Sequence, residues 1–147
     1  MKKLMKRNTK VTVLLFTLAL LFVMAGCGKK TYATVGEWYD DNPAAAAAIT
    51  RAINANGNGE SMTIAIEENN IIYRIVMDEE TFGLSEEMDV IYAQVFDEML
   101  SADEASIKEN IDAIAKDTGV DAGKITIIYE VYNPGASTPG YTKSFKK

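Results

Sequence analysis

The segment Asn54-Ala55-Asn56-Gly57-Asn58-Gly59 comes closest to a metal site in its residue types. Its spacing matches the D-x-[DN]-x-[DN]-G opening of a calcium loop, with Asn in place of the first Asp. The twelfth loop position is Ala65, where a calcium loop needs a bidentate Glu. A helix end that runs into a hairpin explains the same Asn and Gly residues better, because both tolerate positive φ. We therefore expect no metal here.

Two acidic clusters, Glu67-Glu68 and Asp78-Glu79-Glu80, lie on either side of a predicted hairpin. Paired carboxylates do acid–base chemistry when one of them is buried and its pKa is raised. Both clusters fall in predicted turns without apolar neighbours, which indicates solvated surface. Weak binding of a divalent cation is the alternative.

The composition excludes several other kinds of chemistry. The 147 residues include no His and a single Cys, so imidazole metal sites, His-dependent nucleophiles, internal disulfides and Cys-based zinc sites are excluded. Residues 27–147 carry 10 basic and 21 acidic side chains, a balance that argues against binding nucleic acid. No cofactor fingerprint and no nucleophile paired with a base is visible. The sequence thus predicts a domain that binds a partner and catalyses nothing, with no cofactor and no metal.

The N-terminus is predicted to be an address that is removed from the mature protein. A basic region at 2–10 precedes an apolar stretch, Val11–Val23, of 13 residues. A bilayer-spanning helix needs roughly 20 residues, so this stretch is typical of a signal peptide. We assign residues 1–26 to that signal peptide.

Small residues follow the apolar stretch and end at the chain's one cysteine. Met24-Ala25-Gly26-Cys27 resembles the bacterial lipobox, with Met24 where Leu is usual. That resemblance implies lipidation of Cys27, a short tether over 27–34, and a domain held at the extracytoplasmic face of the cell membrane. The alternative is a plain transmembrane anchor in which Cys27 is incidental.

The mature chain predicts an α+β domain over 35–147, in the order α-β-β-α-β-β. We expect a four-stranded antiparallel sheet covered on one face by helices. Thr34 and Asn42-Pro43 start the first two helices, Ser85 caps a third helix that has a bend near 100–102, and Gly119 ends it. The expected elements are helices at 35–41, from 43 through the alanines, and at about 86–117, and strands at 61–67, 71–77, 124–132 and 141–145.

Periodicity also predicts which side chains point inward: Ile71, Tyr73, Ile75 and Met77 in one strand, and a shared face of Ile125, Ile127, Tyr129 and Val131 in another. Met62, Met77, Met88 and Met99 fall on inward faces, which indicates core filler and not a soft-metal site. The third helix carries an apolar stripe at helical spacing: Met88, Ile91, Tyr92, Val95, Phe96 and Met99.

Aromatic residues at two places are candidates for recognition. Trp38 and Tyr39, near the tether, suit either a binding platform or a staple between the first helix and the sheet. The eight-residue turn at 133–140 is longer than a hairpin needs, and long loops often carry function. Tyr132 and Tyr141 flank this turn and Pro134 lies in it.

Three stretches resemble a family of small Gram-positive lipoproteins, the domain-of-unknown-function family 4854. Tyr32-Ala33-Thr34-Val35-Gly36-Glu37-Trp38 is similar to the family opening Y-x-S-V-E-E-Y, with Gly36 in place of Glu and Trp38 in place of Tyr. Asn69-Asn70-Ile71-Ile72-Tyr73 resembles its polar turn and aromatic strand, and Tyr132-Asn133 with Phe145 resembles its last hairpin. The resemblance implies fold and anchoring, and it transfers no functional residue.

We therefore expect a membrane-anchored, non-catalytic binding domain with a protein partner at the cell surface. The alternative is a small-molecule or cation-binding accessory lipoprotein of a transporter or the cell wall. A flat exposed apolar patch favours the protein partner. A polar and aromatic cavity between helix and sheet favours the small ligand.

Overall fold

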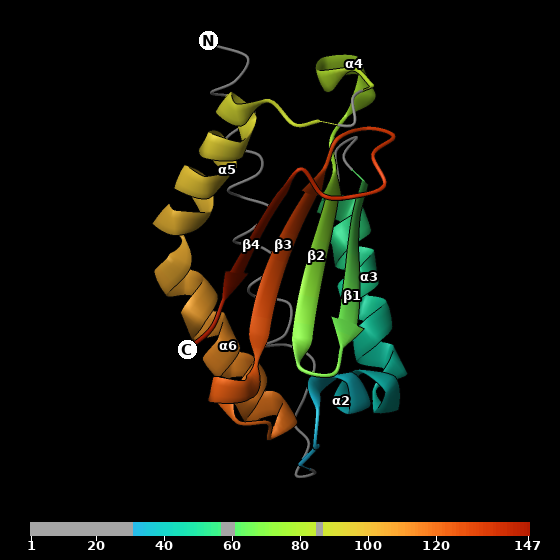
Figure 1. Ribbon diagram of the computed structural model, residues 1–147. Coiled ribbons are helices and arrows are strands. Elements are labelled where there is room, and N and C mark those ends of the chain that lie inside the picture. Colours follow the sequence, from blue (N-terminus) through green and yellow to red (C-terminus); the bar gives the residue numbers. More distant parts are fainter. Residues whose placement is uncertain (1–30, 57–60, 85–86) are drawn as a thin grey trace.

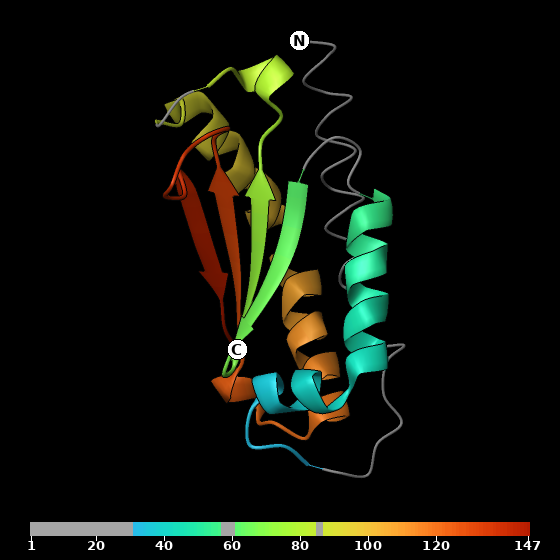
Figure 2. The same ribbon diagram turned by 90° about the vertical axis from the view of Figure 1, so that its right-hand side faces the viewer.

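The computed structural model describes residues 31–56, 61–84 and 87–147 as one helical layer packed against one face of a four-stranded sheet (Figures 1 and 2). The α+β class and the order of elements are as predicted. Among the described residues, no helix is long and apolar enough to cross a membrane. The elements are α2 (Val35–Asp41), α3 (Pro43–Asn56), β1 (Ser61–Glu67), β2 (Asn70–Val76), α4 (Glu79–Phe82), α5 (Val90–Ala102), α6 (Glu104–Thr118), the 3-10 helix η2 (Ala122–Lys124), β3 (Thr126–Tyr132) and β4 (Tyr141–Phe145).

The sheet is mixed, so the prediction of a purely antiparallel sheet was wrong. Its strand order is β1-β2-β3-β4, with antiparallel outer pairs and a parallel central pair in which Tyr73 lies beside Tyr129. Parallel neighbours need a crossover of a dozen residues or more. The connection through α5 and α6 is that long, and it returns the chain to the end of the sheet where β2 begins (Figure 1).

The first two helices begin as predicted. The Thr34 Oγ1 atom accepts a hydrogen bond from the Glu37 amide at 3.1 Å, and α3 begins at Pro43 directly after Asn42. The following hairpin turns at 68–69, where Glu68 has a positive φ of 54°. The calcium-like segment extends past the end of α3, and its glycines lie outside the described residues.

The third predicted helix is two helices. α5 begins at Val90, where the Asp89 carboxylate accepts the Ile91 amide at 2.9 Å; the predicted cap, Ser85, lies outside the described residues. The helix breaks at Asp103, which has φ −95° and ψ 4°. Asp103 thus occupies the position at which the apolar stripe of the predicted helix is interrupted. Gly119, with φ 74°, ends α6 as predicted.

The core lies between the helices and the inward face of the two central strands. Ile71, Tyr73 and Ile75 of β2 are buried there, as alternation predicted. The stacked rings of Tyr73 and Tyr129 have centroids 5.2 Å apart. Met62 and Met77 are buried and Met88 and Met99 pack against the core, in keeping with their interpretation as core filler. No helix of the described residues covers the opposite face of the sheet (Figure 1).

Candidate functional site

The domain has two ends that differ in what they hold (Figure 1). The described chain enters at what we call the tether end, where the Tyr32 amide donates to the Thr118 carbonyl at 3.0 Å. α2, the β1–β2 turn and the C-terminus of α6 lie at the same end. The opposite end, the far end, holds α4, the first turn of α5 and the turn 133–140.

The aromatic residues predicted near the tether are part of the core. Trp38 is 2% exposed, and Tyr39 is half-buried against the same cluster. The Asn42 side chain donates to the Trp38 carbonyl at 2.7 Å, which closes the end of α2. This placement fits the interpretation as a staple, because Trp38 offers almost no surface to a ligand.

The two tyrosines that flank the turn 133–140 point to opposite sides of the sheet. Tyr132 lies on the face without helices, where its hydroxyl donates to the Glu130 carboxylate at 2.8 Å. Tyr141 lies on the helix side, because its register partner is Val131 and not Tyr132. Neighbouring residues of a strand point to opposite faces of the sheet. Tyr141 pairs with the neighbour of Tyr132, so Tyr132 and Tyr141 lie on opposite faces.

The turn itself is folded onto the segment before α5. Asn133 is buried and its amide donates to the Glu87 carbonyl at 2.6 Å. Pro134 is buried as well. A Cβ added to Gly140 would lie 2.5 Å from the Met88 Cβ, so only glycine lets Met88 approach this closely. The turn therefore acts as a brace for Leu84, Glu87 and Met88.

Three large apolar side chains at this far end face solvent. Leu84 is 69% exposed, Val90 78% and Ile91 65%, and we call these three residues the distal patch. The stripe had placed Ile91 inward, and that expectation was wrong. The first turn of α5, which carries Ile91, lies past the end of the sheet, and no strand of the described residues extends that far (Figure 1). Val90, an aliphatic residue outside the stripe, was the signal that sequence reasoning missed.

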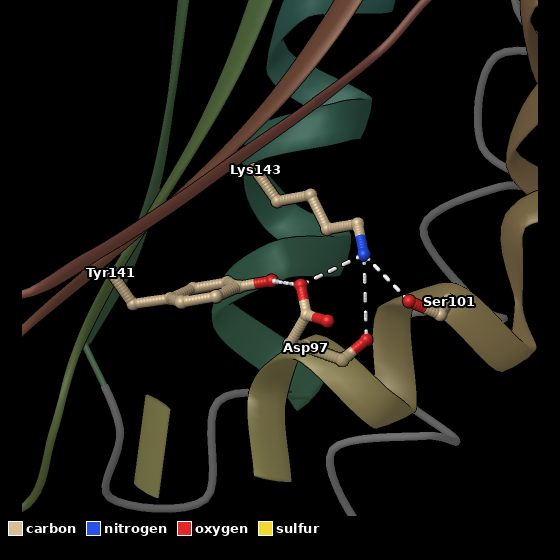
Figure 3. Close-up of polar contacts among 4 residues, drawn as sticks. All are labelled: Asp97, Ser101, Tyr141 and Lys143. Atoms are coloured by element: carbon tan, nitrogen blue, oxygen red, sulfur yellow. Dashed lines mark hydrogen bonds and ion pairs between the residues drawn. The ribbon is translucent and has the colours of Figure 1, made fainter. Parts of the chain in front are cut away.

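A cluster of four polar residues fastens α5 to β4 (Figure 3). We call Asp97, Ser101, Tyr141 and Lys143 the polar clamp. The Lys143 ammonium donates to the Asp97 carboxylate at 2.9 Å and to the Ser101 hydroxyl at 2.6 Å, and the Tyr141 hydroxyl donates to the same carboxylate at 3.0 Å. The hydrogen bond from Lys143, and after it the one from Tyr141, lowers the pKa of Asp97. Burial of Tyr141, together with its bond to Asp97, raises the pKa of the phenol.

Ser101 and Lys143 are the residue types of a serine–lysine nucleophile pair, in which a neutral lysine removes the serine proton. Here the Lys143 ammonium forms an ion pair with the Asp97 carboxylate and donates a hydrogen bond to Ser101, which is the reverse of the direction that a base requires. The Asp97 side chain is also 57% exposed, so water is not kept away. The arrangement favours a structural tie over a base.

The interior of the domain contains buried polar groups that lack hydrogen-bond partners among the described residues. Among the described residues, neither the buried Tyr73 hydroxyl nor the buried Asn110 Oδ1 has a hydrogen-bond partner. Burial raises the pKa of both Tyr73 and Tyr129, so both phenols stay neutral. Within the described part of the chain, no three His, Cys, Asp or Glu residues gather closely enough to hold a metal ion.

A comparison with family models places these features in a known family. The model described as domain of unknown function (DUF4854) matches residues 35–134. The chain belongs to this family. The DUF4854 match runs from α2 to the start of the turn 133–140, so it includes the distal patch and leaves out β4 with Tyr141 and Lys143. No curated protein and no solved structure matches the chain.

Proposed function

We propose that this DUF4854 chain is a lipid-anchored extracytoplasmic domain that binds a protein partner at the cell surface and catalyses no reaction. The distal patch is the observation that carries the proposal. Leu84, Val90 and Ile91 are each more than three-fifths exposed within a stretch of eight residues, and exposed apolar surface of this kind on a small domain marks contact sites for partners.

The position of the patch supports the same proposal. The described chain enters at the tether end, whereas the first turn of α5, which carries Val90 and Ile91, lies at the far end (Figure 1). A lipid on Cys27, four residues before Thr31, would place the tether end at the membrane and direct the patch away from it. A strand of seven residues alone spans about 23 Å, which clears the lipid headgroups. A partner on the outer side would therefore reach the patch.

The experiment is chemical crosslinking in intact cells with a C-terminal tag, followed by mass spectrometry. We expect one protein to be captured in near-equal amount with the full chain. The double variant Val90→Ser, Ile91→Ser should lose that protein, whereas Thr142→Ser, at an exposed position on the sheet face without helices, should retain it. Capture of abundant surface proteins alone would contradict the proposal.

Anchoring has its own test, since Cys27 lies outside the described residues. Cys27→Ser should leave the signal peptide uncleaved at this position and remove the protein from the lipoprotein fraction in detergent partitioning. A variant that is still processed and still partitions as a lipoprotein would show that Cys27 is not the anchor.

A small-molecule or cation-binding accessory role is the second candidate. The observation that favours it is that, among the described residues, neither the buried Tyr73 hydroxyl nor the buried Asn110 Oδ1 on α6 has a hydrogen-bond partner. Buried polar atoms normally have a partner, and a ligand that bonded to them would supply one. A thermal-shift screen with sugars, amino acids and divalent cations tests this. A ligand that stabilises the wild type but not Tyr73→Phe would support it.

A further inference from the structure

The chemistry around the distal patch points to one class of partner. Residues 78–104 contain ten Asp or Glu and no Lys or Arg. Leu84, Val90 and Ile91 all belong to this segment, and the described carboxylates Glu79, Glu80 and Asp89 are exposed on it. An exposed aliphatic surface is therefore combined with a dense negative charge.

Basic residues on β2, α6 and β4 already form ion pairs with other carboxylates. Arg74 pairs with Glu130 at 3.0 Å, Lys108 with Glu104 at 2.6 Å, and Lys143 with Asp97 at 2.9 Å. Within the described residues, Glu79, Glu80 and Asp89 form no ion pair with any of them. The charge of these three carboxylates is thus left for a partner to neutralise.

The same charge disfavours a lipid surface as the occupant. Anionic lipid headgroups attract Lys and Arg and repel carboxylates. The far end is also the end away from the tether (Figure 1). A polypeptide is the occupant that offers cationic and aliphatic side chains together.

We infer that the distal patch binds a basic amphipathic segment of a protein, whose aliphatic side chains cover Leu84, Val90 and Ile91 while its Lys and Arg side chains face the carboxylates of Glu79, Glu80 and Asp89. This inference rests on the proposed function and adds the chemistry of the partner. Three side chains amount to a few hundred Å², below the roughly 800 Å² that each partner buries in a standard interface. The contact is therefore small, steered by charge and sensitive to salt.

The brace beneath the patch keeps it in place for such a contact. The Leu84 Cδ2 atom would lie 3.3 Å from a Cβ added to Gly135, so Leu84 rests on the turn 133–140. Asp89 caps α5 through the Ile91 amide, which fixes the first turn that carries Val90 and Ile91. A patch fixed in this way loses little conformational entropy on binding.

The test is photo-crosslinking in intact cells, with p-benzoylphenylalanine placed in the full chain at position 91 or, as a control, at position 142. The captured peptide is sequenced by mass spectrometry. We expect capture at position 91 and not at 142, and a captured segment with at least two Lys or Arg among aliphatic residues.

Charge variants complete the test. Glu79→Gln with Glu80→Gln should lower the yield at position 91 by about threefold in low-salt medium, and by less in high salt. Asp40→Asn with Glu109→Gln removes the same charge from exposed positions on α2 and α6 and should leave the yield unchanged. Equal yields from both double variants would overturn the inference.

The remaining outcomes separate this inference from the proposed function. A neutral or acidic peptide captured at position 91, or capture at position 142 alone, would overturn the inference and leave a protein partner in place. Capture at neither position would overturn both.

Discussion

Hydrogen bonds hold both ends of the domain, but the two ends differ in which apolar side chains they expose to solvent. At the tether end, the Gly36 amide donates to the Glu68 carbonyl at 2.8 Å and the Asn69 side chain accepts the Val35 amide at 3.1 Å. At the far end, Gly140 donates to Val131 at 2.9 Å and Asn133 donates to Glu87. The tether end buries Val35 and Trp38, whereas the far end exposes Leu84, Val90 and Ile91.

Exposure of the distal patch does not come from a lack of hydrogen bonds or close contacts in the backbone around it. Hydrogen bonds and close glycine contacts hold both ends, so order alone does not distinguish them. Apolar side chains left in water on an ordered surface forgo the stabilisation that burial supplies, about 25 cal/mol per Å². Covering by a partner would recover it.

The largest expected effect comes from the same substitution made at each end. Ile125, at the tether end, is 0% exposed, so Ile125→Ala should lower the free energy of unfolding by about 3 kcal/mol. Ile91→Ala should change it by about 0.5 kcal/mol or less. Urea unfolding followed by the fluorescence of the single tryptophan, Trp38, measures both. An equal loss for the two variants would mean that Ile91 is covered within the monomer.

Two glycines offer a second matched pair. Gly140→Ala would press its methyl group against Met88, and Gly119→Ala would press against Thr31 at a φ of 74°. We expect each to cost about 1–3 kcal/mol in urea unfolding. Only Gly140→Ala should also reduce crosslinking at position 91, because only that residue braces the patch. Loss of crosslinking in both variants would show that lower stability, and not loss of the brace, reduces crosslinking at position 91.

The asparagine at each end gives a smaller effect. Asn69→Ala leaves the Val35 amide without its acceptor, and Asn133→Ala leaves the Glu87 carbonyl without its donor. We expect a loss of about 1–2 kcal/mol for the first and about 1 kcal/mol for the second, since an orphaned amide is the costlier group. Thermal unfolding monitored by circular dichroism compares them. A larger loss for Asn133→Ala than for Asn69→Ala would show that the far end depends more on the Asn133 hydrogen bond than the tether end does on that of Asn69.

The smallest effect concerns pH and the polar clamp. Hydrogen bonds from Lys143 and Tyr141 lower the pKa of Asp97 in the folded state. The resulting stabilisation is complete above the ordinary pKa of 3.8 and is lost as the pH falls through the lower folded-state pKa. Asp97→Asn should therefore be less stable than the wild type at pH 7 and approach it near pH 3. Urea midpoints at the two pH values decide this, and a constant difference would contradict it.

Local sequence signals predicted most of the elements. Thr34, Pro43 and Gly119 mark helix ends because capping and backbone conformation depend on a few neighbouring residues. Alternation in β2 and β3 identified Tyr73 and Tyr129 as inward-facing, because the period of a strand is two wherever one face is buried. Sequence similarity carried the family assignment that the match over 35–134 confirms.

Three features were decided by tertiary structure. The parallel pairing of β2 with β3 depends on where α5 and α6 return the chain, which no local pattern specifies. The separation of Tyr132 from Tyr141 depends on a register in which Tyr141 pairs with Val131. The exposure of Ile91 depends on α5 beginning beyond the end of the sheet. Periodicity tells which residues share a face, but only packing determines whether a neighbouring element reaches far enough to cover that face.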